Sequence, residues 1–175
     1  MATRLEEINK LLDKFGADVV ERAARNLGAY RTIDGKRRRR VASGRLKDDL
    51  TYKIKSRYNN PIISFTTKSR ETGQYADVIE YGRKPNSTPP PIAPILKWIQ
   101  IKGIKPRNEK GGFIKNTESA RRSMARAIQI SIGRKGIKGI MYFNDAVRDT
   151  LDDYGQEFLL ALQRDIEIQL QLNKR

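Results

Sequence analysis

Apolar side chains recur every three or four positions in two long segments, one near each end of the chain, and this spacing predicts amphipathic helices. The first segment spans residues 3–27, where Thr3 and Glu6 fit a capping box. The second spans residues 144–172, with Asn144 as its expected cap. A helix of about eight turns rarely packs fully within a small domain, so we expect part of it to meet a partner chain. Its apolar positions are Val147, Leu151, Tyr154, Phe158, Leu162, Ile166 and Leu170.

The middle of the chain predicts shorter elements. TYKIKSR (51–57) alternates between polar and apolar residues, and IISFTTK (62–68) is rich in β-branched residues, so the two predict a hairpin. YADVIEYG (75–82) fits either a third strand or a short helix. We also expect helices over residues 46–50, 95–102 and 118–132, and a brief strand over residues 140–143.

These elements predict one α+β domain over residues 1–175, in which a small antiparallel sheet packs with long N- and C-terminal helices. Two segments break the pattern and are expected to act as docking arms that order on assembly. Residues 31–42 form a basic loop, which is either a hairpin tip or such an arm. Residues 83–94 contain five prolines, which cannot continue a sheet ladder, so they predict an extended linker or rim loop. The candidate docking residues of the second segment are Arg83, Lys84, Pro89, Pro90 and Pro91.

The composition excludes several kinds of chemistry. The chain has no cysteine and no histidine, which rules out disulfides, Cys/His zinc sites and histidine-based catalysis. No apolar run approaches the roughly 18 residues of a membrane span, and the charged N-terminus does not resemble a signal peptide. We therefore expect a soluble protein made in the cytoplasm, with no membrane partner.

Charge is large and unevenly placed. The chain has 36 basic and 20 acidic residues, a net charge of +16, which favours an acidic partner. Residues 31–47 carry eight bases and one acid, and residues 97–138 carry twelve bases and two acids. Residues 144–172 carry two bases and seven acids. This bipolar pattern predicts head-to-tail contacts between identical subunits, which close into rings or extend as fibres.

Four consecutive arginines stand in the basic loop. Guanidinium groups pair well with phosphates, so the run is a candidate contact for DNA, and an acidic protein neighbour is the alternative. No aromatic residue interrupts residues 36–47, so base stacking is not expected there. The candidate contact residues are Lys36, Arg37, Arg38, Arg39, Arg40 and Arg45.

A second possibility is a KH-like nucleic-acid-binding domain. SIGRKGIKGI (131–140) resembles the Ile-Gly-x-x-Gly-x-x-Ile signature, in which a Gly-x-x-Gly loop joins two helices and holds a nucleic-acid backbone. The residues concerned are Gly133, Arg134, Lys135 and Gly136. The preceding helix fits this pattern, whereas the sequence after Gly139 does not predict a second helix.

Metal-dependent catalysis has one weak candidate. Asp77 and Glu80 share a face if residues 75–82 are helical. A metal nuclease would need a further acidic ligand, and no spacing in the sequence supplies a convincing one. Ion pairs with the many arginines are the simpler interpretation, so we expect no catalytic residues, no metal and no cofactor.

Several segments, taken in order, carry a family resemblance. VASGRLKDDL (41–50) is similar to a "TGRLxxSI" step, and YADVIEYGRKP (75–85) is similar to a "YAxxVExGT" segment. After the proline-rich loop, MYFNDAV (141–147) resembles a "pFlxpAl" step that leads into a final helix. The chain thereby resembles the tail-completion or head–tail joining (neck) proteins of tailed bacteriophages. The matching positions are Gly44, Arg45, Leu46, Tyr75, Ala76, Glu80 and Gly82.

The resemblance implies a structural virion protein without catalytic residues. Such a subunit forms a homo-oligomeric ring at the head–tail junction, as a tail terminator, completion or adaptor protein. Its partners would be identical subunits, portal, adaptor or tail-tube proteins, and packaged DNA bound without sequence specificity. It would reside in the virion, and in the host cytoplasm during assembly.

Overall fold

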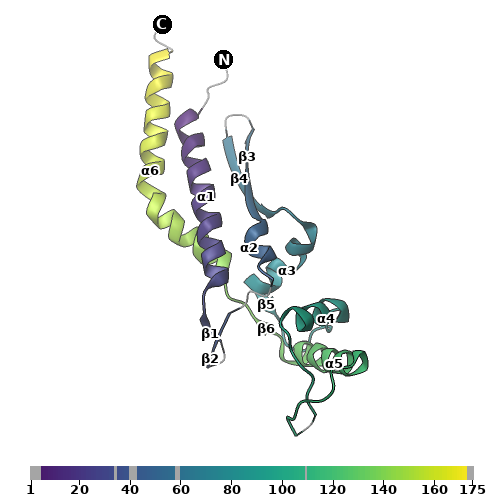
Figure 1. Ribbon diagram of the computed structural model, residues 1–175. Coiled ribbons are helices and arrows are strands. Elements are labelled where there is room, and N and C mark those ends of the chain that lie inside the picture. Colours follow the sequence, from purple (N-terminus) through teal and green to yellow (C-terminus); the bar gives the residue numbers. More distant parts are fainter. Residues whose placement is uncertain (1–4, 34, 40–42, 58–59, 109, 173–175) are drawn as a thin grey trace.

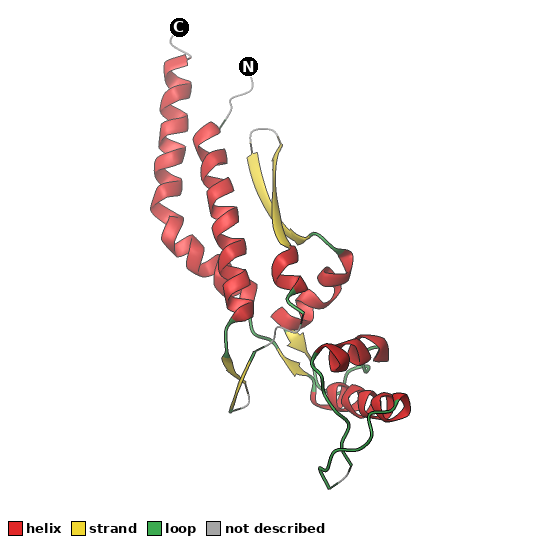
Figure 2. Ribbon diagram, in the orientation of Figure 1, coloured by secondary structure: helices red, strands yellow, loops and turns green. Residues whose placement is uncertain are grey.

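The computed structural model describes residues 5–33, 35–39, 43–57, 60–108 and 110–172. Helix α1 (Glu6–Gly28) runs antiparallel to helix α6 (Tyr142–Leu172), and the hairpin of strands β3 (Leu50–Arg57) and β4 (Asn60–Thr67) lies on the other side of α1 (Figure 1). A separate pair of helices projects from the end of the molecule that lies opposite to the two chain termini (Figure 2). The fold is α+β with long N- and C-terminal helices, as the sequence predicts.

Aromatic side chains hold α1 against the first half of α6. Phe15 and Val19 are buried beside Tyr154. The Phe15 ring meets the rings of Tyr154 and Phe158 edge to face, at centroid distances of 5.7 and 5.6 Å, an arrangement that aromatic pairs prefer. Helix α6 bends partway along its length (Figure 1). In this helix the buried Thr150 hydroxyl donates to the Ala146 carbonyl at 2.7 Å, a bond that often bends helices.

The hairpin packs against α1 at a glycine. Tyr52 pairs with Phe65 and Ile54 with Ile63 across the two strands. A Cβ atom on Gly16 of α1 would lie 2.6 Å from the Tyr52 ring, so only glycine permits this close approach. The Tyr52 hydroxyl donates to Asp13 at 2.8 Å, and this bond raises the pKa of Tyr52. The hairpin predicted over residues 51–57 and 62–68 is confirmed.

A second apolar core joins the short elements to the start of α6. Strand β1 (Arg31–Ile33) pairs with β2 (Lys36–Arg38), and helices α2 (Arg45–Asp49) and α3 (Arg70–Glu80) come before and after the hairpin in the chain. Because side chains from several elements meet here, this core fixes where α6 begins. Its buried members are Ala23, Leu27, Ile33, Leu46, Ile140, Tyr142 and Ala146.

Residues 84–136 form a lobe between two short paired strands, β5 (Gly82–Arg83) and β6 (Ile137–Lys138). The lobe contains α4 (Ile92–Ile101) and α5 (Glu118–Lys135), which bury their own cluster of apolar residues. Thr117 caps α5, since its hydroxyl accepts from the Ala120 amide at 3.2 Å. The lobe is therefore a small helical unit inserted at the β5–β6 ladder.

Residues 75–82, for which the sequence predicts either a strand or a short helix, lie mostly in helix α3. Three other sequence predictions need correction. Residues 140–143 are not a strand, since α6 begins at Tyr142 rather than at Asn144. The antiparallel strands of the described chain form three separate two-stranded ladders instead of one sheet. Finally, α1 begins at Glu6 and not at residue 3; the side chain of its N-cap residue Leu5 makes no capping hydrogen bond, and the predicted cap Thr3 lies outside the described residues.

Candidate functional site

The first turn of α1 is capped by a residue from the other end of the chain. Asp165 of α6 is 2% exposed, and its two carboxylate oxygens accept the amides of Glu7 at 3.1 Å and Ile8 at 3.0 Å. A carboxylate at a helix N-terminus satisfies unpaired amides and interacts favourably with the helix dipole. This contact locks the end of α6 to the start of α1.

Replacing Asp165 with alanine should lower the free energy of unfolding by about 1–2 kcal/mol, because two amides lose their acceptor. Hydrogen exchange should accelerate at the amides of Glu7 and Ile8 before it does so in the hairpin. The nearby Glu167→Ala variant is the control, since Glu167 accepts a hydrogen bond from Gln163 on its own helix. Unchanged protection in the Asp165 variant would contradict the proposed cap.

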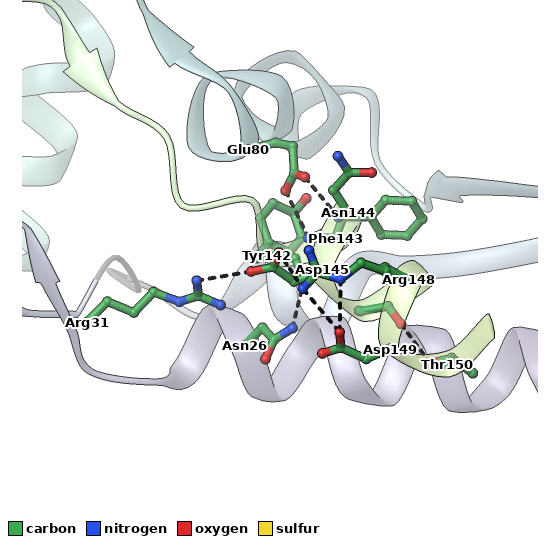
Figure 3. A network of polar contacts seen from close by, with 11 residues as sticks. Asn26, Arg31, Glu80, Tyr142, Phe143, Asn144, Asp145, Arg148, Asp149 and Thr150 are labelled. Carbon is green, nitrogen blue, oxygen red and sulfur yellow. Dashed lines mark hydrogen bonds and ion pairs between the residues drawn. The ribbon is translucent and has the colours of Figure 1, made fainter. Parts of the chain in front are cut away.

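A second remote cap lies at the other end of α6 (Figure 3). Glu80, the last residue of α3, is 4% exposed. Its carboxylate accepts the amides of Phe143 at 2.8 Å and Asn144 at 2.9 Å. The Met141 amide also donates to the Glu80 carbonyl at 3.0 Å. Both carboxylate oxygens of Glu80 are thus engaged in starting α6.

Polar contacts from α1 and β1 complete this junction (Figure 3). The Asn26 side chain donates to the Tyr142 carbonyl at 3.0 Å, and Arg31 pairs with Asp145 at 3.3 Å. Arg148 also pairs with Asp145, at 3.3 Å. Burial, followed by the charge of Glu80, raises the pKa of the Tyr142 hydroxyl. These contacts join α1, β1, α3 and α6. The charged groups among them already have partners within the subunit.

The residues of the resemblance gather around this junction. Tyr75 and Ala76 lie on α3, where Ala76 packs against the second core. Glu80 caps α6 as described, and Gly82 opens β5 with φ = +84°. A Cβ atom on Gly82 would lie 2.1 Å from the Ile137 carbonyl oxygen. Packing, capping and backbone conformation within the subunit therefore account for the residues found at Ala76, Glu80 and Gly82.

The residues of the first family-like motif, in VASGRLKDDL (41–50), also have structural roles within the subunit. Gly44 adopts φ = +85° at the start of α2, a conformation that favours glycine. Leu46 is buried in the second core. Arg45 pairs with Glu71 of α3 at 3.4 Å, so this predicted contact residue is engaged within the subunit.

The first part of the basic run forms strand β2 of the β1–β2 hairpin. Lys36, Arg37 and Arg39 are exposed, and the Arg37 guanidinium lies 5.2 Å from the Tyr30 ring centroid. Arg38 ends strand β2, and Arg40 lies outside the described residues. Ile33 pairs with Lys36 next to the turn of this hairpin and is buried in the second core, so the hairpin packs on the body of the subunit while Lys36, Arg37 and Arg39 stay exposed.

The proline-rich segment lies along α5 instead of extending freely. The amides of Asn86 and Ser87 donate to the carbonyls of Arg134 at 3.2 Å and Gly133 at 3.0 Å. Gln129 donates to the Pro90 carbonyl at 2.7 Å. Arg83 turns back to the Thr88 carbonyl at 2.6 Å. The remaining predicted docking residues, Lys84, Pro89 and Pro91, keep exposed surface.

The glycines of the KH-like signature serve packing. Gly133 is buried, and a Cβ atom there would lie 2.9 Å from Pro89. Gly136 ends α5 with φ = +71°, where a Cβ atom would lie 2.3 Å from the Arg83 carbonyl oxygen. Strand β6 follows directly, not a second helix. This geometry does not favour a KH-like backbone clamp.

An apolar stripe on α6 is exposed on the surface of the subunit. It comprises side chains that are 43–69% exposed on one side of the helix, and we call this set the α6 stripe. It turns away from α1, because Tyr154, Ala161 and Asp165 occupy the inward side. Exposed apolar patches of this kind mark interaction surfaces. Its members are Leu151, Leu159, Leu162, Ile166 and Leu170.

The outer face of the hairpin lies on the opposite side of α1 (Figure 1). There Lys55 stands opposite Ile62, and Lys53 stands opposite Ser64. These four side chains are exposed, and Ile62 is 54% exposed. The subunit thus carries an apolar face on an acidic helix and a basic face on its other side.

An open groove lies between the hairpin and α3, and Glu80 lines it. Since both oxygens of Glu80 already accept amides, the groove offers no free pair of carboxylates with Asp77. In the described part of the chain, no group of three or more acidic side chains is placed to hold a metal ion. No described helix combines the length and the apolar character that crossing a membrane requires.

Comparisons with known proteins give no relative: no protein-family model, no curated protein and no solved structure matches this chain.

Proposed function

We propose that this chain is a structural protein of a tailed-phage virion that assembles as a homo-oligomeric ring at the head–tail junction. The order of motifs in the sequence suggests the family, and the α6 stripe is the observation that carries the assembly. In this proposal the chain performs no catalysis, and it binds identical subunits together with portal, adaptor or tail-tube proteins.

The stripe supports assembly because leaving it in water is unfavourable. Moving a half-exposed leucine out of water contributes about 1 kcal/mol, so the five residues of the stripe would contribute roughly 5 kcal/mol when covered. Asp152, Gln156, Gln163 and Glu167 lie along one edge of the stripe, so that edge is polar and acidic. A partner surface with basic side chains fits such an edge, because it pairs these charges when the stripe is covered.

A second copy is the occupant that the charges favour. Residues 144–172 have seven acids and two bases, whereas the hairpin residues 50–67 have three bases and no acid. The α6 stripe of one subunit would contact the outer hairpin face of the next, where Lys53, Lys55 and Ile62 lie. Because the two faces differ and lie on opposite sides of α1, repeated contact is heterologous and closes a ring when the rotation permits.

The double variant Leu162→Glu/Ile166→Glu tests this contact. We expect the wild-type chain to sediment as a ring in analytical ultracentrifugation, and the double variant to sediment as a monomer. The far-ultraviolet circular dichroism of the double variant should match that of the wild type, because substitutions at exposed positions seldom alter the fold of the subunit. The matched control is Leu160→Glu, since Leu160 is 53% exposed on another side of α6, and it should assemble normally.

A phage assay tests the placement in the virion. A phage that lacks this protein should accumulate DNA-filled heads and separate tails. The wild-type chain and Leu160→Glu should restore joined particles, and the double variant should not. Normal particles without the protein, or a double variant that sediments like the wild type, would contradict the proposal.

A further inference from the structure

Most of the excess positive charge lies in the α4–α5 lobe. Residues 84–136 contain twelve basic and two acidic residues, a net charge of +10 within a chain of net charge +16. The lobe projects away from α1 and α6, at the end of the molecule opposite to the chain termini (Figure 1). The largest share of the net positive charge therefore lies in the lobe, outside the arginine run of β2.

One side of α5 concentrates this charge. Arg122, Arg126 and Arg134 are exposed and follow each other at intervals of four and eight residues, which places them on one side of the helix. Ser119 and Ser123 lie on the same side and are also exposed. Ser119 and Ser123 stand on either side of Arg122 and can donate to a phosphate there, whereas Ile130, 43% exposed, lies between Arg126 and Arg134. We call Ser119, Arg122, Ser123, Arg126 and Arg134 the α5 basic face.

The acids of the described chain neutralise this face only in part. On α6, Asp153 pairs with Arg22 at 2.6 Å and Glu157 with Lys14 at 3.9 Å, while Asp165 caps α1. Within the described lobe, Glu118 is the single acid, and it pairs with Arg122 at 3.2 Å. The head-to-tail charge contact expected from the sequence therefore leaves most of the lobe's charge for another partner.

We propose that the α5 basic face binds the phosphate backbone of double-stranded DNA without sequence specificity. Binding releases condensed counterions, and each neutralised phosphate contributes about 0.9 to the slope of log K against log salt concentration. The inference goes beyond the assembly proposed above and does not depend on it, because a single subunit carries the complete face.

A duplex fits the lobe better than a single strand does. Single-strand binding uses aromatic platforms on which bases stack. Phe113 is the most exposed aromatic ring of the described lobe, at 66%, and the Arg107 guanidinium already covers it at 4.4 Å from the ring centroid. The most exposed ring of the described lobe is therefore already covered by a guanidinium group.

The test compares two triple variants that remove the same charge. In Arg122→Gln/Arg126→Gln/Arg134→Gln, glutamine keeps a similar helix propensity and leaves the α6 stripe intact. The matched variant is Lys36→Gln/Arg37→Gln/Arg39→Gln in the arginine run. Fluorescence anisotropy with a labelled DNA duplex of mixed sequence, between about 50 and about 200 mM salt, gives the affinity and its salt slope.

We expect the α5 variant to lose at least about tenfold in duplex affinity at about 100 mM salt, and its slope to fall by about 2.7. Its sedimentation and circular dichroism should match those of the wild type, which separates this result from a failure of assembly or folding. Equal loss in the arginine-run variant would overturn the assignment. So would tighter binding to single-stranded DNA than to duplex, or binding to polyglutamate but not to DNA.

Discussion

Replacing Gly82 with alanine is expected to lower the free energy of unfolding by about 2–5 kcal/mol. A left-handed backbone conformation costs a non-glycine residue about 1–2 kcal/mol, and Gly82 has φ = +84°. The new Cβ atom would also lie 2.1 Å from the Ile137 carbonyl oxygen and 2.6 Å from the Gly139 nitrogen. These are backbone atoms, so the clash can be relieved only by separating β5 from β6, at about 1–3 kcal/mol or more.

Chemical denaturation measures this loss, and Gly103→Ala is its control. Gly103 has a positive φ of +62°, but no atom lies within 4 Å of the position that a Cβ atom would occupy there. The control therefore isolates the conformational cost, about 1–2 kcal/mol. If both variants lose the same stability, the close approach of β5 to β6 contributes nothing.

Replacing Glu80 with alanine should cost about 2–4 kcal/mol. The change removes both acceptors of the Phe143 and Asn144 amides, and a buried donor without a partner costs about 1–3 kcal/mol. It also removes a negative charge from the N-terminus of α6, where a carboxylate is favourable. Thermal unfolding followed by circular dichroism should show a midpoint lower by about 4–16 °C.

Two further variants separate the cap from other effects. Glu80→Gln keeps one carbonyl acceptor and should lose about half as much stability. Glu71→Ala removes an exposed carboxylate from the same helix, where the ion pair with Arg45 is exposed, and should change stability by less than about 1 kcal/mol. Equal losses for Glu71 and Glu80 would contradict the proposed cap.

Local periodicity is sufficient to predict most elements of the fold. The two long helices, the β3–β4 hairpin and α5 with its Thr117 cap all lie where the sequence predicts them. The apolar positions of residues 75–82 fit neither the helical nor the strand period, so the sequence does not decide between the two. Packing of this segment on the second core stabilises the helix. Tertiary contacts decide the cases that spacing leaves open.

The apolar residues of α6 do not all lie on one side of the helix, although their spacing of three and four residues predicts that they do. Each step of four residues along a helix advances by about 400°, so a run of such steps drifts by about 40° each time. Tyr154 and Phe158 therefore face α1, whereas Leu162, Ile166 and Leu170 are exposed. The sequence predicts one apolar face, and the structure divides it into a buried half and the α6 stripe.

The remote caps have no signal in the sequence. Asp165 and Glu80 each accept amides from a helix far along the chain, and capping rules consider only residues next to a helix end. Glu80 does belong to the family-like motif, but its role follows only from the junction geometry. The basic lobe, by contrast, is evident in the sequence as a run of charge, although its arrangement on α5 is not.

The most direct test of the assembly uses the absence of cysteine from the chain. A single cysteine at Leu162 reports on the α6 stripe, and a single cysteine at Leu160 reports on another exposed side of the same helix. We predict that the rate of maleimide labelling falls with protein concentration in Leu162→Cys and stays constant in Leu160→Cys. Equal rates at every concentration, with both cysteines reacting as in the isolated subunit, would contradict the claim that another copy covers the stripe.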